Sequence, residues 1–230
     1  MLSKSLIAKF CLIISLGLVS GCGFVFRMAG SVSGSGNVIS ESRDVEDFDR
    51  ISFAGSGTLT IVVGQPTAIE LKCDDNLLPL IRTEVKDGTL HIYPDQPIMP
   101  TDDLRIDIST EQLKRFALAG SCKATIDALD SKRLELAISG SGNITCQGTA
   151  EELAIEIAGS GDVNCFELAS RTVQVSIAGS GEVSVHALDR LKVRIAGSGR
   201  VRYEGNPTVE QQIAGSGSIV PVSQAVENPD

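Results

Sequence analysis

Two acidic residues and one basic residue recur at a spacing that could place them side by side on one surface. Asp162, Glu182 and Arg200 each stand three positions after the first glycine of a Gly-Ser-Gly triplet. If the triplets mark equivalent points of a repeat, these side chains form an outward column. Its two carboxylates could bind a cation or act as acid and base on a substrate. A solvated ladder of charges explains the spacing with fewer assumptions, and we favour that interpretation.

Two cysteines share a column of the same repeat. Cys146 and Cys165 lie one repeat apart, so parallel stacking would bring their Cα atoms within the range of a disulfide. As small apolar residues they also fit a core column between Ile126 and Val185, and we favour this simpler interpretation. The cysteines that follow residue 22 show no C-x-x-C spacing, so we predict no metal site and no cofactor.

The triplets could also be mistaken for loops that bind phosphate or carry a nucleophile. A phosphate loop leads into a helix and needs a lysine at a set position, whereas these triplets lead into β-rich segments. None has the Gly-x-Ser-x-Gly spacing of a nucleophile elbow. His91 and His186 are isolated in the sequence, and Tyr93 and Tyr203 are its only tyrosines. We therefore expect no catalytic residues and predict that the protein is not an enzyme.

The triplet is the strongest periodic signal in the 230 residues. Self-similarity at a period of about 20 residues indicates a solenoid, in which each repeat buries its apolar face against its neighbours. Apolar residues alternate with polar ones on both sides of each triplet, which indicates short strands with one buried face. Three such strands in each turn would form a parallel β-helix with glycine at a corner. The triplets begin at Gly34, Gly55, Gly120 (with Cys122 in third place), Gly140, Gly159, Gly179, Gly197 and Gly215.

Residues 44–115 follow this period less well. They contain several strand patterns and a helical turn near Pro79. We expect this region to cap the N-terminal end of the solenoid, whose open edge would otherwise pair with other chains. Roughly eight turns would then form a rod on the order of 40 Å long.

The N-terminus carries the features of an export signal. Lys4 and Lys9 form a short basic segment before an apolar stretch, residues 10–19, that is too short for a stable transmembrane helix. The next residues, Ser-Gly before Cys22, resemble the bacterial lipobox, in which the cysteine is acylated and becomes the mature N-terminus. The sequence therefore predicts a lipid anchor on Cys22. An ordinary signal peptidase site is the alternative, but it would not require a cysteine at this position. Gly23, in place of an aspartate that retains lipoproteins in the inner membrane, favours the outer membrane of a Gram-negative bacterium.

Charge and composition limit the partners. The formal net charge of -9 argues against nucleic acid, which needs a basic face.

The predicted organisation is a signal peptide (1–21), a linker after the lipidated cysteine (22–31), a β-helix domain (32–220) and a disordered tail (221–230).

An ordered set of motifs resembles the putative auto-transporter adhesin, head GIN domain family of bacterial envelope proteins. The resemblance covers residues 32–220. It implies an all-β fold, a right-handed parallel β-helix with 18–21 residues per turn, and its name implies adhesion. The family defines no catalytic residues. The matching stretches are Phe48-Asp49-Arg50-Ile51, Ala54-Gly55-Ser56-Gly57, Asp75-Asn76-Leu77-Leu78, Asp87-Gly88-Thr89-Leu90 and the serial triplets.

These expectations together favour a non-enzymatic lipoprotein of the cell envelope that acts as an adhesin or surface-binding module. Its partners would be the membrane, through the lipid anchor, and an envelope protein or glycan. Two alternatives stay open: a carbohydrate-active enzyme on the same fold, and a passive structural or stress-related envelope lipoprotein. A deep groove with clustered titratable groups would distinguish the enzyme.

Overall fold

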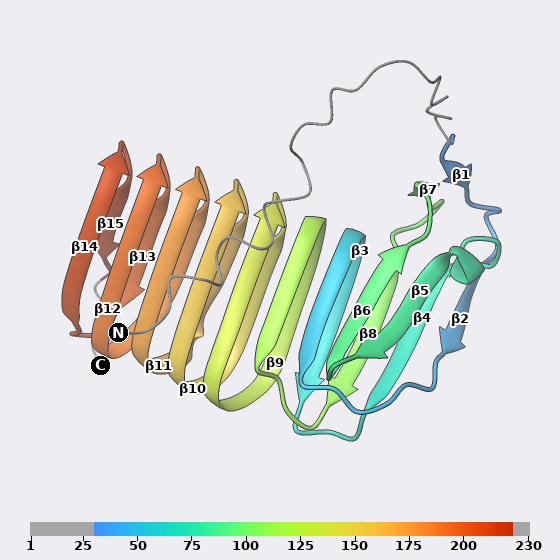
Figure 1. Ribbon diagram of the computed structural model, residues 1–230, viewed down its shortest axis with the longest axis horizontal. Coiled ribbons are helices and arrows are strands. Elements are labelled where there is room, and N and C mark those ends of the chain that lie inside the picture. The colour runs from blue at the N-terminus through green and yellow to red at the C-terminus, as the bar shows by residue number, and fades with distance from the viewer. Residues whose placement is uncertain (1–29, 223–230) are drawn as a thin grey trace, which may run out of the picture.

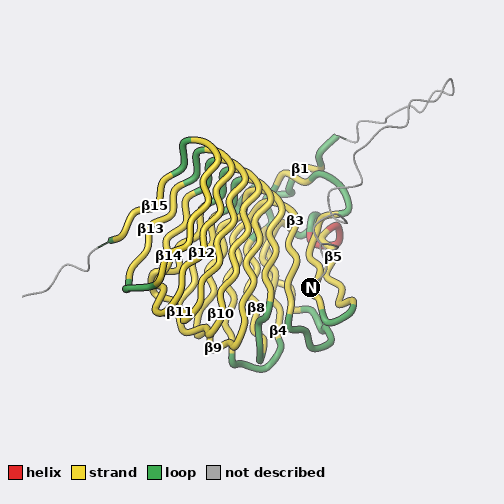
Figure 2. The backbone as a smooth tube through the Cα atoms, turned by 60° about the vertical axis from the view of Figure 1, so that its left-hand side comes forward, coloured by secondary structure: helices red, strands yellow, loops and turns green. Residues whose placement is uncertain are grey.

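The computed structural model describes residues 30–222, which form a parallel β-solenoid with one short 3-10 helix. Figure 1 shows the turns stacked along the long axis, and Figure 2 shows that strand accounts for most of each turn. The predicted signal peptide, Cys22, and most of the linker and tail lie outside the described residues. The strands are β1 (Val32–Ser33), β2 (Val38–Ser42), β3 (Arg50–Val63), β4 (Ala68–Asp74), β5 (Ile81–Lys86), β6 (Thr89–Pro94), β7 (Ile98–Met99), β8 (Arg105–Thr110), β9 (Arg115–Gly140), β10 (Asn143–Gly159), β11 (Asp162–Gly179), β12 (Glu182–Gly197), β13 (Arg200–Glu204), β14 (Thr208–Gly215) and β15 (Ser218–Pro221); the 3-10 helix η1 is Leu78–Leu80.

The regular turns stack in parallel, as the periodicity predicts. Asn143 pairs with Lys123 in the preceding turn and with Asp162 in the following one, which are spacings of 20 and 19 residues. Glu182 pairs with Arg200 at a spacing of 18. The all-β fold and the predicted turn length are therefore confirmed.

The strands are longer than the three short strands expected in each turn. β10 extends without interruption from Asn143 to the next corner at Gly159. Its inward residues still fall into three segments, separated by consecutive outward residues at 147–149 and 151–152. The backbone hydrogen-bond ladder between turns continues around these bends. Gly148, with φ of 130°, lies at one of the bends.

The core is a stack of apolar columns inside the solenoid. Each turn contributes inward side chains on both sides of its corner, so every one packs on its counterpart in the next turn. The column two residues before the corner is fully or almost fully buried at Leu118, Ile138, Ile157, Ile177 and Ile195.

The N-terminal region caps one end of the solenoid, as expected, but it does so as an insertion. β3 is itself a regular turn, because Arg50 through Val62 pair in register with Arg115 through Asp127 of β9. Residues 64–114 leave the stack between them. They return as β6 and β8, which pair in parallel with β3, while β4, β2 and β5 add antiparallel edges.

The expectation that the first triplet forms a corner of the repeat is wrong. Gly34, Ser35 and Gly36 lie beside the turn after β4, outside the stack. The Gly36 N–H donates to Asp74 Oδ1 at 2.7 Å, and the Ser35 hydroxyl donates to Asp75 Oδ1 at 2.5 Å. Because this triplet lies outside the stack and the cap interrupts the next one, about five regular turns form, fewer than eight.

The C-terminal turn of the solenoid has no further described turn on its outer side. β14 pairs with β12 and β15 with β13, and each has one partner among the described strands. Gln211 occupies the inward column that Val193 fills one turn earlier, and Pro221 ends β15. A polar inward residue and a proline both hinder the addition of another strand.

Candidate functional site

The solenoid corner presents a continuous surface of very small side chains. In each turn an alanine or serine, a glycine and a serine follow one another, and the serine is exposed. We call this surface the corner strip. It consists of Ala54-Gly55-Ser56, Ala119-Gly120-Ser121, Ser139-Gly140-Ser141, Ala158-Gly159-Ser160, Ala178-Gly179-Ser180, Ala196-Gly197-Ser198 and Ala214-Gly215-Ser216.

Backbone hydrogen bonds hold the corner strip in register. The Ser160 N–H donates to the Gly140 carbonyl oxygen at 2.9 Å, and the Ser180 N–H donates to the Gly159 carbonyl oxygen at 2.9 Å. The backbone alone makes this ladder. The hydroxyls are left on the exposed side, where a partner could reach them.

The predicted charged column lies directly beside the corner strip. Asp162, Glu182 and Arg200 occupy successive turns in register. Asp162 Oδ1 accepts the Glu182 N–H at 3.0 Å, and Glu182 Oε2 lies 3.9 Å from Arg200 Nη1. The structure thus brings together the three residues that the sequence singled out. Their side chains form a surface ladder and do not line either described cavity.

Arg202 is a member of this surface that the sequence analysis missed. Its guanidinium forms an ion pair with the Glu182 carboxylate of the neighbouring turn. This contact is shorter than the one between Arg200 and the same carboxylate. Its guanidinium also lies 6.0 Å from the centre of the Phe166 ring, in the range of a cation–π contact. The signal was present, since Arg202 stands two residues after Arg200 and therefore faces the same side of the strand.

Cys146 and Cys165 meet inside the core. Both are buried, and both are free thiols in the structure. A hydrogen bond with Cys165 and burial together raise the pKa of the Cys146 thiol. The contact fits either interpretation of the pair, so the disulfide stays a prediction.

Of the remaining titratable groups singled out by the sequence, His91 and Tyr93 lie together on β6, where His91 pairs with Glu84 of β5, and Tyr203 lies on β13. The Tyr93 hydroxyl donates to Glu84 Oε1 at 2.9 Å, and Lys86 Nζ lies 2.8 Å from the same oxygen. These hydrogen bonds lower the pKa of Glu84, and the bond from Lys86 is the largest cause. His186 lies on β12, far along the chain from this group. Within residues 30–222 no group of three or more histidine, cysteine, aspartate or glutamate residues is placed to hold a metal ion.

The fold and this surface define a class: a parallel β-solenoid that exposes one repetitive, small-residue edge bordered by charges. The sequence model of the family described as "Putative auto-transporter adhesin, head GIN domain" matches residues 47–207. The chain therefore belongs to that family, and the resemblance seen in its motifs is confirmed. No curated protein matches the chain.

Solved structures of bacterial proteins share the fold. A putative adhesin from Bacteroides fragilis NCTC 9343 is 21% identical with a TM-score of 0.69, over 84% of this chain and 100% of that one. A putative lipid binding protein from Parabacteroides distasonis ATCC 8503 is 26% identical with a TM-score of 0.60, over 84% and 100% of the two chains. A putative adhesin from the same strain is 25% identical with a TM-score of 0.51, again over 84% and 100%.

These comparisons support the general expectation of an adhesin-like protein of the surface or envelope. They do not by themselves define a ligand, since a fold is compatible with many functions. No helix in residues 30–222 has the length and apolar character needed to cross a membrane.

Proposed function

We propose that this chain is a non-enzymatic binding module of the bacterial cell envelope, held at the outer membrane of a Gram-negative bacterium by a lipid on Cys22. Its partner would be a glycan or protein of another surface, bound along the corner strip and the adjacent charged ladder. The observation that carries the proposal is the corner strip itself. Its repeated, exposed small side chains allow an extended polymer to approach the backbone closely.

An extended repeat surface suits this kind of binding physically. Each turn offers the same serine hydroxyl and the same flat backbone, spaced by about 4.8 Å along the stack. Many weak contacts of this kind add up when one polymer engages several turns at once. The ladder of Asp162, Glu182 and Arg200 would then set which charges the polymer may carry.

The two carboxylates of this ladder are already engaged. Asp162 accepts a backbone N–H, and Glu182 pairs with Arg200 and Arg202. An acid–base pair in a glycosidase needs two carboxyl groups on either side of a bound sugar in a cleft, a geometry unlike this surface ladder. For this reason we do not propose the carbohydrate-active enzyme.

Site-specific crosslinking in intact cells tests the binding surface. A photo-crosslinking amino acid at Ser160 or Ser180 should capture one defined polymer or protein. The matched control carries it at Glu151, which is exposed on β10 away from the corner strip. Ala178→Arg, or Glu182→Gln combined with Arg200→Gln, should reduce the adduct. Equal adducts from Glu151, or none from either serine, would contradict the proposal and favour a passive envelope role.

A separate experiment tests the anchor. Cys22→Ala should abolish both acylation and the processing that makes residue 22 the mature N-terminus, as followed by mass spectrometry of the N-terminus and by fractionation. A Cys22→Ala protein that is processed and membrane-bound like the parent chain would overturn the lipid anchor and leave the binding surface untouched.

A further inference from the structure

One turn of the solenoid replaces the tight corner by a longer connection. β6 and β8 stack beneath the two arms of β3, because Phe53 pairs with Ile92 and Thr58 pairs with Arg105. In the regular turns a Gly-Ser-Gly triplet joins the equivalent arms, whereas residues 95–104 join them here. We call this segment the arch. Insertions at one position of a repeat often form the binding face of a solenoid.

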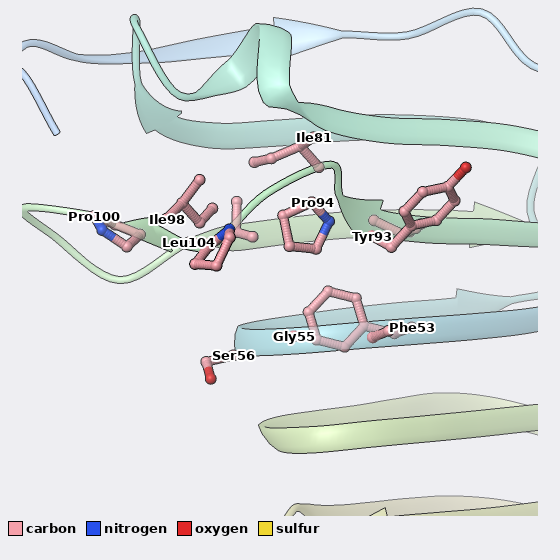
Figure 3. A pocket seen from close by; sticks show the side chains of 12 residues that line it. Phe53, Gly55, Ser56, Ile81, Tyr93, Pro94, Ile98, Pro100 and Leu104 are labelled. Carbon is pink, nitrogen blue, oxygen red and sulfur yellow. The ribbon is translucent and has the colours of Figure 1, made fainter. Parts of the chain in front are cut away.

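The arch covers a cavity of about 200 Å³ at the N-terminal end of the corner strip. Figure 3 shows Ile98, Leu104 and Pro94 on one side of this space and the ring of Phe53 on the other, with Ile81 farther out. The cavity exceeds the roughly 150 Å³ of an apolar cavity that takes up benzene in another protein. It therefore has room for part of a small apolar ligand.

The topology of the cap creates this space. A Cβ on Gly55 would come no closer than 3.4 Å to another atom, the Phe53 ring. In a regular turn a Cβ on Gly140 would lie 2.4 Å from the Gly120 carbonyl oxygen. The arch thus leaves open the position that the backbone of a further turn would occupy, and the space does not depend on one missing side chain.

The lining contains no charged residue. It offers aliphatic, aromatic and proline side chains that pack a hydrocarbon well and cannot compensate a buried charge. The lining residues are Phe53, Ala54, Gly55, Ser56, Ile81, Ile92, Tyr93, Pro94, Pro97, Ile98, Pro100 and Leu104.

The arch carries exposed acidic residues. Asp95, Asp102 and Asp103 are exposed there, and residues 95–104 contain no lysine or arginine. Arg82 pairs with Asp95 at 2.6 Å. Asp103 Oδ2 accepts the Thr58 hydroxyl at 2.6 Å, and among the described residues neither Asp102 nor Asp103 forms an ion pair. An anionic head group at the mouth of the cavity would be repelled, while a cationic one would be attracted.

We propose that this cavity binds the end of one unbranched hydrocarbon chain whose head group stays in solvent and is uncharged or cationic. The inference does not depend on adhesion through the corner strip. Two sources could supply such a chain: a separate lipid, or the lipid predicted on Cys22. The lipid on Cys22 is a candidate because the N-terminal segment is bound to the arch. Val32 pairs with Ile98, and the Gly34 N–H donates to the Met99 carbonyl oxygen at 2.9 Å.

Titration of the mature chain, residues 22–230 produced without the signal peptide and carrying Cys22→Ala, tests the cavity. The probes are decyl maltoside, decyltrimethylammonium and decanoate, each below its micelle-forming concentration. Calorimetry should show saturable binding of the first two at one site, with perturbed methyl resonances of Ile98 and Leu104. Decanoate should bind at least about tenfold more weakly because of the acidic arch. The absence of saturable binding by all three probes, or equal binding of decanoate, would overturn the proposal.

A matched pair of substitutions locates the ligand. Ile98→Trp fills the cavity and should weaken binding at least about tenfold. Met99→Trp changes the next residue of β7, whose side chain is 59% exposed, and should leave binding unchanged. Circular dichroism and thermal unfolding verify that both variants fold. Unchanged binding by a folded Ile98→Trp chain would place the ligand elsewhere and refute the assignment.

A comparison with the lipidated chain distinguishes the two sources. If the protein's own lipid fills the cavity, the acylated chain should bind decyl maltoside only after proteolytic removal of its N-terminus. If a separate lipid is the ligand, acylated and Cys22→Ala chains should bind the probe equally. Either result supports a hydrocarbon site and identifies its occupant.

Discussion

A Cβ atom on Gly179 would lie 2.1 Å from the carbonyl oxygen of Gly159, one turn earlier in the solenoid. The same carbonyl accepts the Ser180 N–H at 2.9 Å, so the two backbones cannot separate without losing this bond. Gly179 also has a φ of 137°, a conformation that residues with a side chain rarely adopt. Steric exclusion and backbone conformation therefore both require glycine at the corner.

Gly179→Ala should for this reason lower the free energy of unfolding by about 3 kcal/mol or more. Urea unfolding followed by circular dichroism measures the loss. The matched control is Ser180→Ala, since that exposed hydroxyl should change stability by no more than about 0.5 kcal/mol. A Gly179→Ala chain as stable as the Ser180→Ala chain would show that the corner can relax, contrary to this account.

Because the structure brings the two thiols into hydrogen-bond contact, we expect Cys146 and Cys165 to form a disulfide during folding, before the pair is buried, when a disulfide oxidant of an exported compartment is present. Each thiol loses a proton, and the pair passes two electrons to the oxidant as the S–S bond forms. The bridge would close a loop of about 20 residues and should raise the free energy of unfolding by about 3 kcal/mol. Peptide mapping of protein purified from cell envelopes identifies the bond. Recovery of two unmodified thiols under these conditions would favour the simpler apolar-core interpretation.

Burial should keep Cys122 unreactive in the folded protein. Desolvation, with a smaller effect of the Asp103 charge, raises the pKa of its thiol to about 12. Almost no thiolate is then present at pH 8, and the thiolate is the reactive form. A chromogenic disulfide reagent should modify Cys122 in urea and leave it intact in native buffer. Rapid modification of the native protein would contradict both its burial and its pKa.

Asp74 should make the attachment of the N-terminal segment sensitive to acid. Hydrogen bonds from the Thr101 and Gly36 N–H groups lower the pKa of this buried carboxyl from its usual 3.8, with the Thr101 bond the largest cause. The folded state thus binds the proton less readily than the unfolded state. The resulting stability is fully present above pH 3.8 and is lost as the pH falls through the folded-state pKa.

Asp74→Asn should therefore lower the unfolding temperature at pH 7 and reduce the further decrease between pH 4 and pH 2. Thermal unfolding across this range measures both effects. If the curves of the parent chain and the variant decline in parallel below pH 4, the carboxylate is not responsible for the acid sensitivity.

The exposed C-terminal turn should promote self-association when Gln211, its polar inward residue, is replaced by valine. Gln211 lies in register with buried Val193, so Gln211→Val would extend an apolar column to an open end. Burial of the added side chain between two molecules should strengthen self-association by about tenfold. Light scattering after size exclusion measures it. Gln212→Val, on the outward side of β14, is the control and should leave the molecular mass unchanged.

The sequence by itself determined the repetitive part of this protein. Alternating apolar residues on both sides of a glycine corner allow only one face to be buried, and a constant period requires identical turns to stack. The positions of Ile157, Ile177 and Ile195 in one column, and of Asp162 beside Glu182, followed directly from that spacing and match the register observed.

The tertiary structure decided what the period does not encode. Residues 64–114 contain strands of ordinary composition, and only their packing shows that β6 and β8 form one further turn joined by the arch. The Gly34 triplet has the same sequence as the others, yet it lies away from the corner. It hydrogen-bonds Asp74 and Asp75, which are about 40 residues distant in sequence. The cavity arises from the same cause, because local sequence patterns describe neighbours along the chain and a cavity depends on which distant segments close around it.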